Sequence, residues 1–96
     1  METKHAQETW YESSTGNHQG LIISETTGEN IAVTYDKRNA PLIAAAPELL
    51  TAAENALEFF YFLMSDPDLP KECRADAHRK WDQANTAITK ATGDQA

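Results

Sequence analysis

The alternation of apolar and polar side chains in the first third of the chain predicts three β-strands. The predicted strands span residues 9–13, 20–25 and 31–36. A period of two places alternate side chains on opposite faces of a sheet. Turn-forming residues fill the segments 13–19 and 26–30, where Gly28 can adopt a positive φ. We therefore expect a three-stranded antiparallel meander over residues 9–36.

The third predicted strand has the clearest alternation and suggests which face of the meander is buried. Ile31, Val33 and Tyr35 alternate with smaller or more polar residues. A bare three-stranded sheet is only marginally stable in water. We therefore expect the helical half of the chain to cover the face that carries these three side chains.

After the strands the composition changes to alanine and leucine, which predicts helices. Asn39 is suited to cap a helix, and Pro41 fits its first turn, where the missing N–H costs little. Pro47 then interrupts the helix, because proline removes a backbone donor and disfavours helical geometry in the residue before it. The pattern predicts a short corner helix over residues 40–45 and a longer helix over residues 47–64.

A third helix is predicted over residues 71–92, after a turn at residues 65–70 and with Gly93 as its stop. Apolar residues at helical spacing define one core stripe on each long helix. The stripe of the second helix comprises Leu50, Ala53, Leu57, Phe60 and Met64, and that of the third comprises Cys73, Ala77, Trp81, Ala84, Ile88 and Ala91. The expected fold is α+β, with the meander packed against these two antiparallel helices. We expect residues 1–96 to form a single domain with a flexible start at residues 1–8.

One segment resembles a known element. Residues 39–50 read Asn-Ala-Pro-Leu-Ile-Ala-Ala-Ala-Pro-Glu-Leu-Leu, and this motif is similar to one in small phage and prophage proteins that share no assigned activity. The commonest form of that motif has arginine where this chain has Pro41. The similarity covers residues 31–57. It implies a phage origin and identifies no catalytic residue, and its apolar positions have the helical spacing of a core.

The charge of the chain disfavours two classes of partner. Fifteen acidic and eight basic residues give a formal net charge of −7, and residues 39–70 contain five acids and no Lys or Arg. Such a chain repels nucleic-acid phosphates and anionic lipid. We expect no direct binding of nucleic acid and no membrane association, although an acidic surface that imitates nucleic acid toward a basic partner stays open. The absence of a membrane-spanning apolar run and the single cysteine favour the cytoplasm of a bacterial host cell.

The sequence offers no pattern for catalysis, a metal or another cofactor. His5, His18 and His78 are scattered and lack the short spacing of metal ligands. Cys73 lies on the apolar stripe and is expected to be a small buried hydrophobe rather than a nucleophile. Gly16 and Gly28 belong to loops between strands, not to a phosphate-binding loop.

The strongest functional signal is a run of six apolar residues, 59–64, which covers every side of a helix although a small two-layer domain buries only part of that circumference. Glu54 and Glu58 lie four residues apart, and a solvated surface is the favoured interpretation for this pair. The predicted surface for a partner or for self-association comprises Trp10, Tyr11, Glu12, Glu54, Glu58, Phe59, Phe62 and Leu63.

These observations favour a non-enzymatic, phage-encoded accessory protein that binds and inhibits or modulates a host protein complex. The most concrete form of this hypothesis is an anti-CRISPR or other anti-defence protein that acts against a nucleic-acid-binding effector. If the chain self-associates, a homodimer is the simplest oligomer. One alternative is an oligomer that sequesters a nucleotide signal. That alternative requires convergence of Lys37, Arg38, Arg74, Arg79 or Lys80 on a phosphate. Another alternative is a minor structural phage protein.

Overall fold

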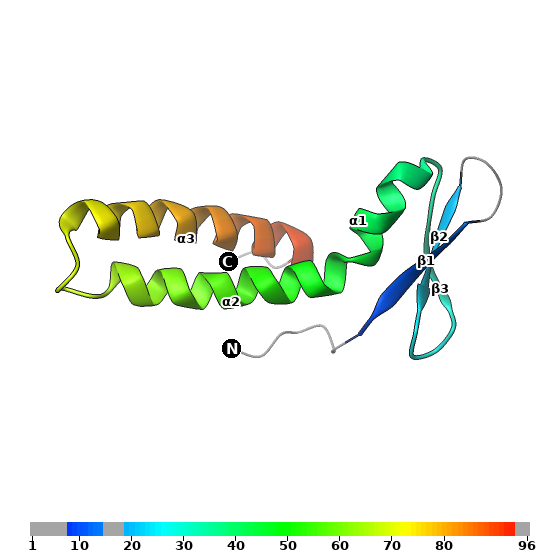
Figure 1. Ribbon diagram of the computed structural model, residues 1–96, viewed down its shortest axis with the longest axis horizontal. Helices are drawn as coiled ribbons and strands as arrows, with labels where there is room; N and C mark the ends of the chain where they lie inside the picture. Colours follow the sequence, from blue (N-terminus) through cyan, green and yellow to red (C-terminus); the bar gives the residue numbers. More distant parts are fainter. Residues whose placement is uncertain (1–7, 15–18, 94–96) are drawn as a thin grey trace. The chain divides into compact units, whose positions relative to one another are not determined.

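The computed structural model describes residues 8–14 and 19–93, which form an α+β fold (Figure 1). The elements in chain order are β1 (Trp10–Ser14), β2 (Gly20–Ser24), β3 (Asn30–Thr34), the 3₁₀ turn η1 (Lys37–Asn39), α1 (Ala40–Ala44), α2 (Ala46–Met64) and α3 (Lys71–Thr92). The α+β prediction is confirmed, and every predicted element is present. Most of the predicted flexible start and the middle of the first predicted loop lie outside the described residues.

The chain divides into two compact units at Leu49 and Leu50. The first unit holds the sheet and α1, and the second holds the helical hairpin of α3 and most of α2. That the chain folds as a single domain stays a prediction.

The sheet is an antiparallel meander in the order β1-β2-β3. Tyr11 pairs with Ile23 and Leu21 pairs with Val33, and the register shifts between Ile22 and Ile23. Gly28 has the positive φ of 74° that the turn before β3 requires, so this expectation is confirmed.

The face of the sheet that α1 covers consists mainly of small residues. Ile22 is fully buried and forms the core of this unit with Ala40 and Ala44 of α1. A Cβ atom built on Gly20 would lie 2.8 Å from the Cβ of Ala40, which shows how closely the helix approaches the strand. Trp10 packs against the same core.

The prediction that Ile31, Val33 and Tyr35 form the covered face is wrong. These side chains are exposed, by 39, 47 and 78 % respectively. In β3 it is instead Ala32 that packs against the core, while Thr34 is buried. The physical reason is the close approach of α1, because only small side chains leave room for an alanine-faced helix.

Local capping differs in part from the expectation. Asn39 occupies the N-cap position of α1 with Pro41 in the first turn, but its side chain makes no capping hydrogen bond. The carboxylate of Asp36 caps the preceding turn η1 instead, by accepting a hydrogen bond from the backbone N–H of Arg38. A proline-started corner helix is therefore confirmed, whereas a side-chain cap by Asn39 is wrong.

The two long helices, α2 and α3, pack together as an antiparallel hairpin (Figure 1). Proline and glycine set their bounds as predicted: Pro47 lies in the first turn of α2, and Gly93 ends α3 with a φ of 75°. The stripe on α2 is at least half-buried, as is the middle of the stripe on α3, where Ala77 is the most buried member. Cys73 and Ala91, at the two ends of the α3 stripe, are exposed. The prediction of a buried Cys73 is therefore wrong, because this residue lies in the first turn of the helix, where little chain covers it.

Candidate protein-binding surfaces

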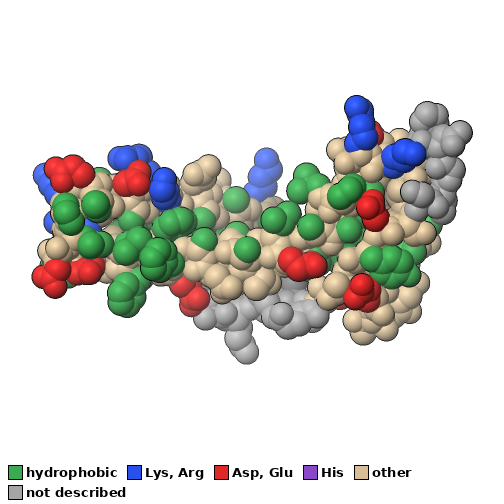
Figure 2. All heavy atoms as spheres, viewed as in Figure 1, with side chains coloured by type: hydrophobic (Ala, Val, Ile, Leu, Met, Phe, Trp, Pro, Cys, Tyr) green, Lys and Arg blue, Asp and Glu red, His purple; other side chains and the backbone are tan. Residues whose placement is uncertain are grey.

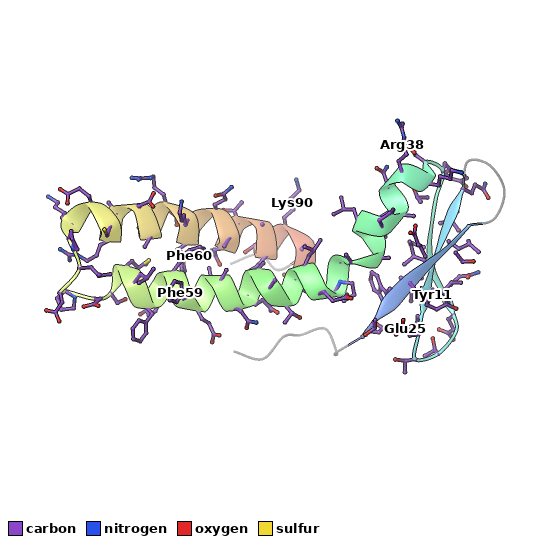
Figure 3. All side chains as sticks on the ribbon, in the orientation of Figure 1. Tyr11, Glu25, Arg38, Phe59, Phe60 and Lys90 are labelled. Carbon is purple, nitrogen blue, oxygen red and sulfur yellow. The ribbon has the colours of Figure 1, made fainter. Side chains whose placement is uncertain are left out.

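The helical unit exposes two phenylalanines that lie one turn apart on α2. Phe59 is 60 % exposed and Phe62 is 72 % exposed, and we call them the aromatic pair. Phe60, by contrast, is half-buried on the side of α2 that faces α3 (Figure 3). The ring of Phe59 lies 6.5 Å from that of Phe60, in a tilted arrangement. This contact supports the outer ring against a partly buried one.

Apolar side chains gather near the turn of the hairpin (Figure 2). Tyr61, also on α2, is 58 % exposed, but at about 100° per residue it projects from a different side of the helix than the aromatic pair, and Leu63 is half-buried. Because an aromatic side chain can bury about 150–250 Å², the pair alone exposes on the order of 200–300 Å². A typical interface buries about 800 Å² on each partner, so the pair could supply the apolar centre of one.

The two predicted glutamates on α2 differ in environment. Glu58 is exposed and lies next to the aromatic pair in sequence. Glu54 is 9 % exposed, so the expectation that it belongs to a solvated surface is wrong. Spacing alone could not reveal this, because the burial of Glu54 depends on the tertiary surroundings of α2. In the structure as described, Glu54 is not available to a partner.

The remaining predicted interface residues lie in the sheet unit, and β1 does not present them together. Trp10 is half-buried and contributes to the core. Tyr11 and Glu12 are exposed, but as neighbours on a strand they point to opposite faces of the sheet. Only Tyr11 lies on the face opposite α1.

That outer face of the sheet is an apolar surface that the sequence reasoning missed. Its exposed members are Tyr11, Ile31 and Val33, and the half-buried Leu21 and Ile23 lie between them in the register. The period of two in the third strand did signal an apolar face. It could not indicate that α1 would cover the opposite face of the sheet.

Cations gather on α3, whereas α2 has none (Figure 2). Asp76 contacts Arg79, three residues along the helix, at 3.0 Å and Lys80, four residues along, at 3.6 Å. His78 lies 3.7 Å from Asp82 on the same helix. Arg79 and Lys80, two of the cations that the nucleotide alternative requires, are therefore paired with a neighbouring carboxylate, and a third, Arg38, pairs with Asp36.

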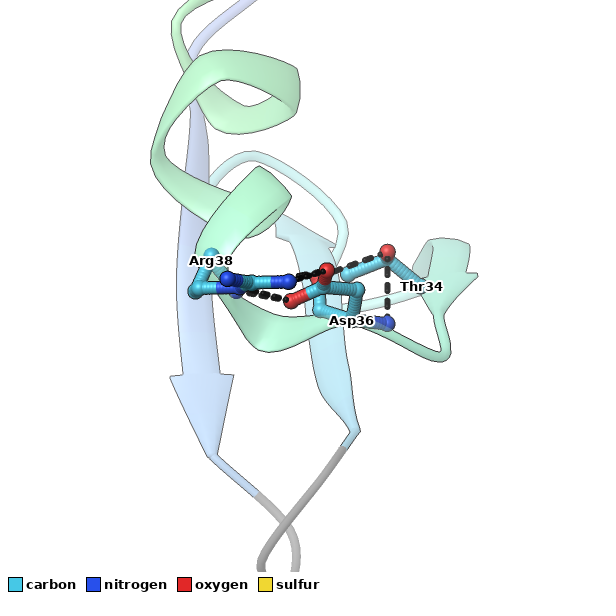
Figure 4. A network of polar contacts seen from close by, with 3 residues as sticks. All are labelled: Thr34, Asp36 and Arg38. Carbon is cyan, nitrogen blue, oxygen red and sulfur yellow. Dashed lines mark hydrogen bonds and ion pairs between the residues drawn. The ribbon is translucent and has the colours of Figure 1, made fainter.

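A polar network joins the end of β3 to the turn η1 (Figure 4). The Thr34 hydroxyl donates to the carbonyl of Asp36 and accepts from its N–H. The Arg38 guanidinium donates to both carboxylate oxygens of Asp36, with the shortest contact, from Nη2 to Oδ2, at 2.8 Å. This hydrogen bonding lowers the pKa of Asp36 below its ordinary value of 3.8 and raises that of Arg38.

We expect Arg38→Gln to move the pKa of Asp36 back toward its ordinary value. The pKa of the Asp36 carboxyl is lower in the folded protein than in the unfolded chain, so ionised Asp36 stabilises the fold at pH values above the unfolded pKa. This stabilisation is lost as the pH falls through the folded pKa, which lies below 3.8. NMR titration of the Asp36 carboxyl carbon measures the shift. Lys37→Gln is the matched control, since it removes a neighbouring charge that makes no hydrogen bond to Asp36. If Asp36 had the same pKa in the two variants, the hydrogen bonds from Arg38 would not be the cause of its lowered pKa.

The described part of the chain shows no grouping of three or more His, Cys, Asp or Glu side chains that could hold a metal ion. Nor does any helix among these residues have the length and apolar character needed to cross a bilayer.

Comparison with known proteins identifies a phage family. The family model of Salmonella phage P22 protein Y8K6 matches residues 1–95. No curated protein and no solved structure matches the chain. The family match extends over both units and agrees with the phage origin that the motif at residues 39–50 implied. The chain therefore belongs to the family of Salmonella phage P22 protein Y8K6, a family of small phage proteins.

Proposed function

We propose that this phage protein is a non-enzymatic accessory protein that binds a protein complex in the host cytoplasm and inhibits or modulates it. The observation that carries the proposal is the exposed aromatic pair, Phe59 and Phe62. Large aromatic side chains on a surface expose apolar area that is costly in water, and they are the side chains enriched at the centres of protein interfaces.

The charge around the aromatic pair favours a basic partner. Helix α2 carries no Lys or Arg, and the exposed Glu58 lies next to the aromatic pair in sequence. An aromatic centre with an acidic border complements a protein surface that is apolar in the middle and basic at its rim. Proteins that bind nucleic acid present basic surfaces of this kind.

The most concrete form of the proposal is an anti-defence protein, such as an anti-CRISPR protein. Defence effectors that act on phage genomes must bind nucleic acid, so their working surfaces are basic. Occlusion of such a surface would protect the phage without any chemical step. This action requires only a folded scaffold and an exposed contact surface.

We expect Phe59→Ala/Phe62→Ala to abolish protection in a challenge assay. A host that carries a defence system would express the protein before infection, and plaque counts would be compared with those of the same host without it. The wild type should raise the counts. The double variant should lose this effect, since truncation of one aromatic anchor at an interface commonly costs about 2 kcal/mol or more.

Tyr61→Ala is the matched control, because it removes an aromatic side chain of similar exposure from the same helix. It should retain protection. Circular dichroism should show that all variants keep their helical content. Protection by the double variant equal to that of the wild type would refute a role for the aromatic pair, and no protection by the wild type across a panel of defence systems would refute the anti-defence form.

A further inference from the structure

Helix α2 carries a second apolar stripe beside its core stripe. The members of this second stripe are Ala52, Ala56, Phe59 and Leu63, and we call it the open stripe. Each member immediately precedes a residue of the core stripe, so the open stripe is rotated from the core stripe by about 100° around the helix. Its spacing of four, three and four residues is the spacing with which one helix faces another in a coiled coil.

The open stripe is only partly covered in the structure. Phe59 is 60 % exposed and Ala52 is exposed, while the other two members are half-buried. No member is charged, and the residues that border the stripe on its outer side within this span, Asn55 and Phe62, are uncharged as well. A helix that packs against the open stripe would therefore bury no charge of α2, which removes the main cost of covering such a surface.

The order of side-chain sizes along the open stripe indicates what fits it. The small residues Ala52 and Ala56 come first, and the large residues Phe59 and Leu63 follow. A second copy of α2 in parallel orientation would oppose large side chains to large ones and leave the alanine end unfilled. In antiparallel orientation each large side chain instead meets an alanine, whose small size leaves the space for it. The open stripe is therefore complementary to itself.

We propose that two copies of the chain form a two-fold dimer in which their α2 helices pack antiparallel along the open stripe. The axis passes level with the peptide bond between Leu57 and Glu58. Ala56 then faces Phe59 of the second copy, and Ala52 faces Leu63 of the second copy. Because a two-fold contact uses the same surface on both chains, each pairing occurs twice. The antiparallel orientation also places the helix dipoles favourably.

The length of the open stripe and the charge of the chain set the strength of this dimer. The stripe extends over roughly 17 Å of helix, so the contact is smaller than the typical interface of about 800 Å² on each partner. The net charge of −7 on each copy opposes association further. We therefore expect a dissociation constant on the order of 10–100 μM.

The dimer bears on the proposed function because it covers Phe59. Phe62 borders the open stripe and stays at the rim of the contact. A consequence that rests on the proposed function is that self-association competes with the target for Phe59. A dimer of this strength yields to a target that binds more tightly, since mass action favours the tighter complex.

Sedimentation equilibrium in the absence of any target tests the dimer. We expect the wild type to dimerise between about 10 μM and 1 mM, and Ala52→Lys to raise the dissociation constant about tenfold or more, because it places an ammonium group against Leu63 of the second copy. Ala75→Lys is the matched control, since it makes the same change at an exposed alanine of α3, and it should leave the constant unchanged.

Circular dichroism and the melting temperature should show that both lysine variants still fold, because each replaces an exposed alanine. A wild type that stays monomeric over this concentration range would overturn the proposal. A dimer that Ala52→Lys leaves unchanged would overturn it as well.

An exchange of side-chain sizes tests which residues face each other. Phe59→Ala should weaken the dimer about tenfold or more, since it leaves alanine against alanine. The double variant Ala56→Phe/Phe59→Ala should recover most of the lost affinity, because the large and the small position have exchanged places. Phe62→Ala should change the affinity little. A double variant that binds itself no better than Phe59→Ala would contradict the facing of these two positions.

Crosslinking tests the orientation of the two helices. In a Cys73→Ser background, chains with Ala52→Cys and chains with Leu63→Cys would be mixed and treated with a short bismaleimide. We expect a covalent dimer from the mixture and none from either variant alone, because each cysteine lies far from its own copy across the axis. A covalent dimer from Ala52→Cys alone would show parallel pairing and overturn the antiparallel arrangement.

Salt separates the dimer from the complex with the proposed target. Added salt screens the repulsion between two chains of −7 each, so it should tighten the dimer, whereas it should weaken the binding of an acidic surface to a basic target. The two proposals therefore fail separately. A wild type that dimerises but gives no protection would refute the proposed function alone, and a protective protein that stays monomeric would overturn the dimer alone.

Discussion

Ile22→Ala is expected to lower the free energy of unfolding by about 2–5 kcal/mol. Ile22 is the largest side chain that the described part of the chain buries completely. Its neighbours in the core are Ala40 and Ala44, whose short side chains cannot move into the space that the truncation leaves. The cost therefore includes the lost apolar burial and a cavity that collapses poorly.

Urea denaturation monitored by far-UV circular dichroism measures this loss. Ile31→Ala is the control, because it removes the same atoms from a residue of the same sheet that is 39 % exposed. Its cost should stay below about 1 kcal/mol. Equal losses for the two variants would contradict the assignment of Ile22 to the core and of Ile31 to the surface.

Gly20→Ala is expected to destabilise the protein by about 1–3 kcal/mol, although alanine is the smallest possible addition. Its Cβ would lie 2.8 Å from the Cβ of Ala40 and 3.3 Å from Cγ2 of Thr34. Neither the strand nor the helix can move without loosening the contact between α1 and the sheet. The strain thus arises from packing and not from the backbone conformation of Gly20, whose φ is not positive.

A double-mutant cycle separates this clash from other effects of the substitution. Ala40→Gly alone should cost about 1 kcal/mol, as glycine does in a helix, but it removes the atom that Gly20→Ala would meet. The double variant should therefore be more stable than the sum of the single losses predicts. Additive losses would mean that the two Cβ positions do not meet.

The helices were predictable because proline and glycine mark their ends. Pro41 and Pro47 each lie in the first turn of a helix, and Gly93 ends α3 in the left-handed conformation. These residues act through their own backbone geometry, which does not depend on the tertiary fold. The predicted bounds of the long helices therefore agree with the structure within one residue.

The buried face of the sheet was not predictable by the same means. Alternation separates Ile31 and Val33 from Ala32 and Thr34, but it does not say which set is covered. Hydrophobicity favoured the larger side chains, whereas the close approach of α1 at Gly20 selected the smaller ones.

The candidate site was predicted where it depends on helical geometry alone. Phe59 and Phe62 lie outside the core stripe of α2, and both are exposed as expected. Glu54 and Cys73 were misjudged, because their burial depends on what lies around each turn of the helix. Their spacing in the sequence contains no information on this.

The order of the strands also bears on how fast the protein forms. Each strand pairs with its neighbour in the sequence, α1 covers the sheet that immediately precedes it, and α3 returns along α2 after a short turn. Such a low contact order requires little loop-closure entropy to be lost before the native contacts form, which favours rapid folding. The sheet unit is complete at Leu49, so its contacts can form while the rest of the chain is still on the ribosome. A protein built in this way can reach its folded state soon after its synthesis.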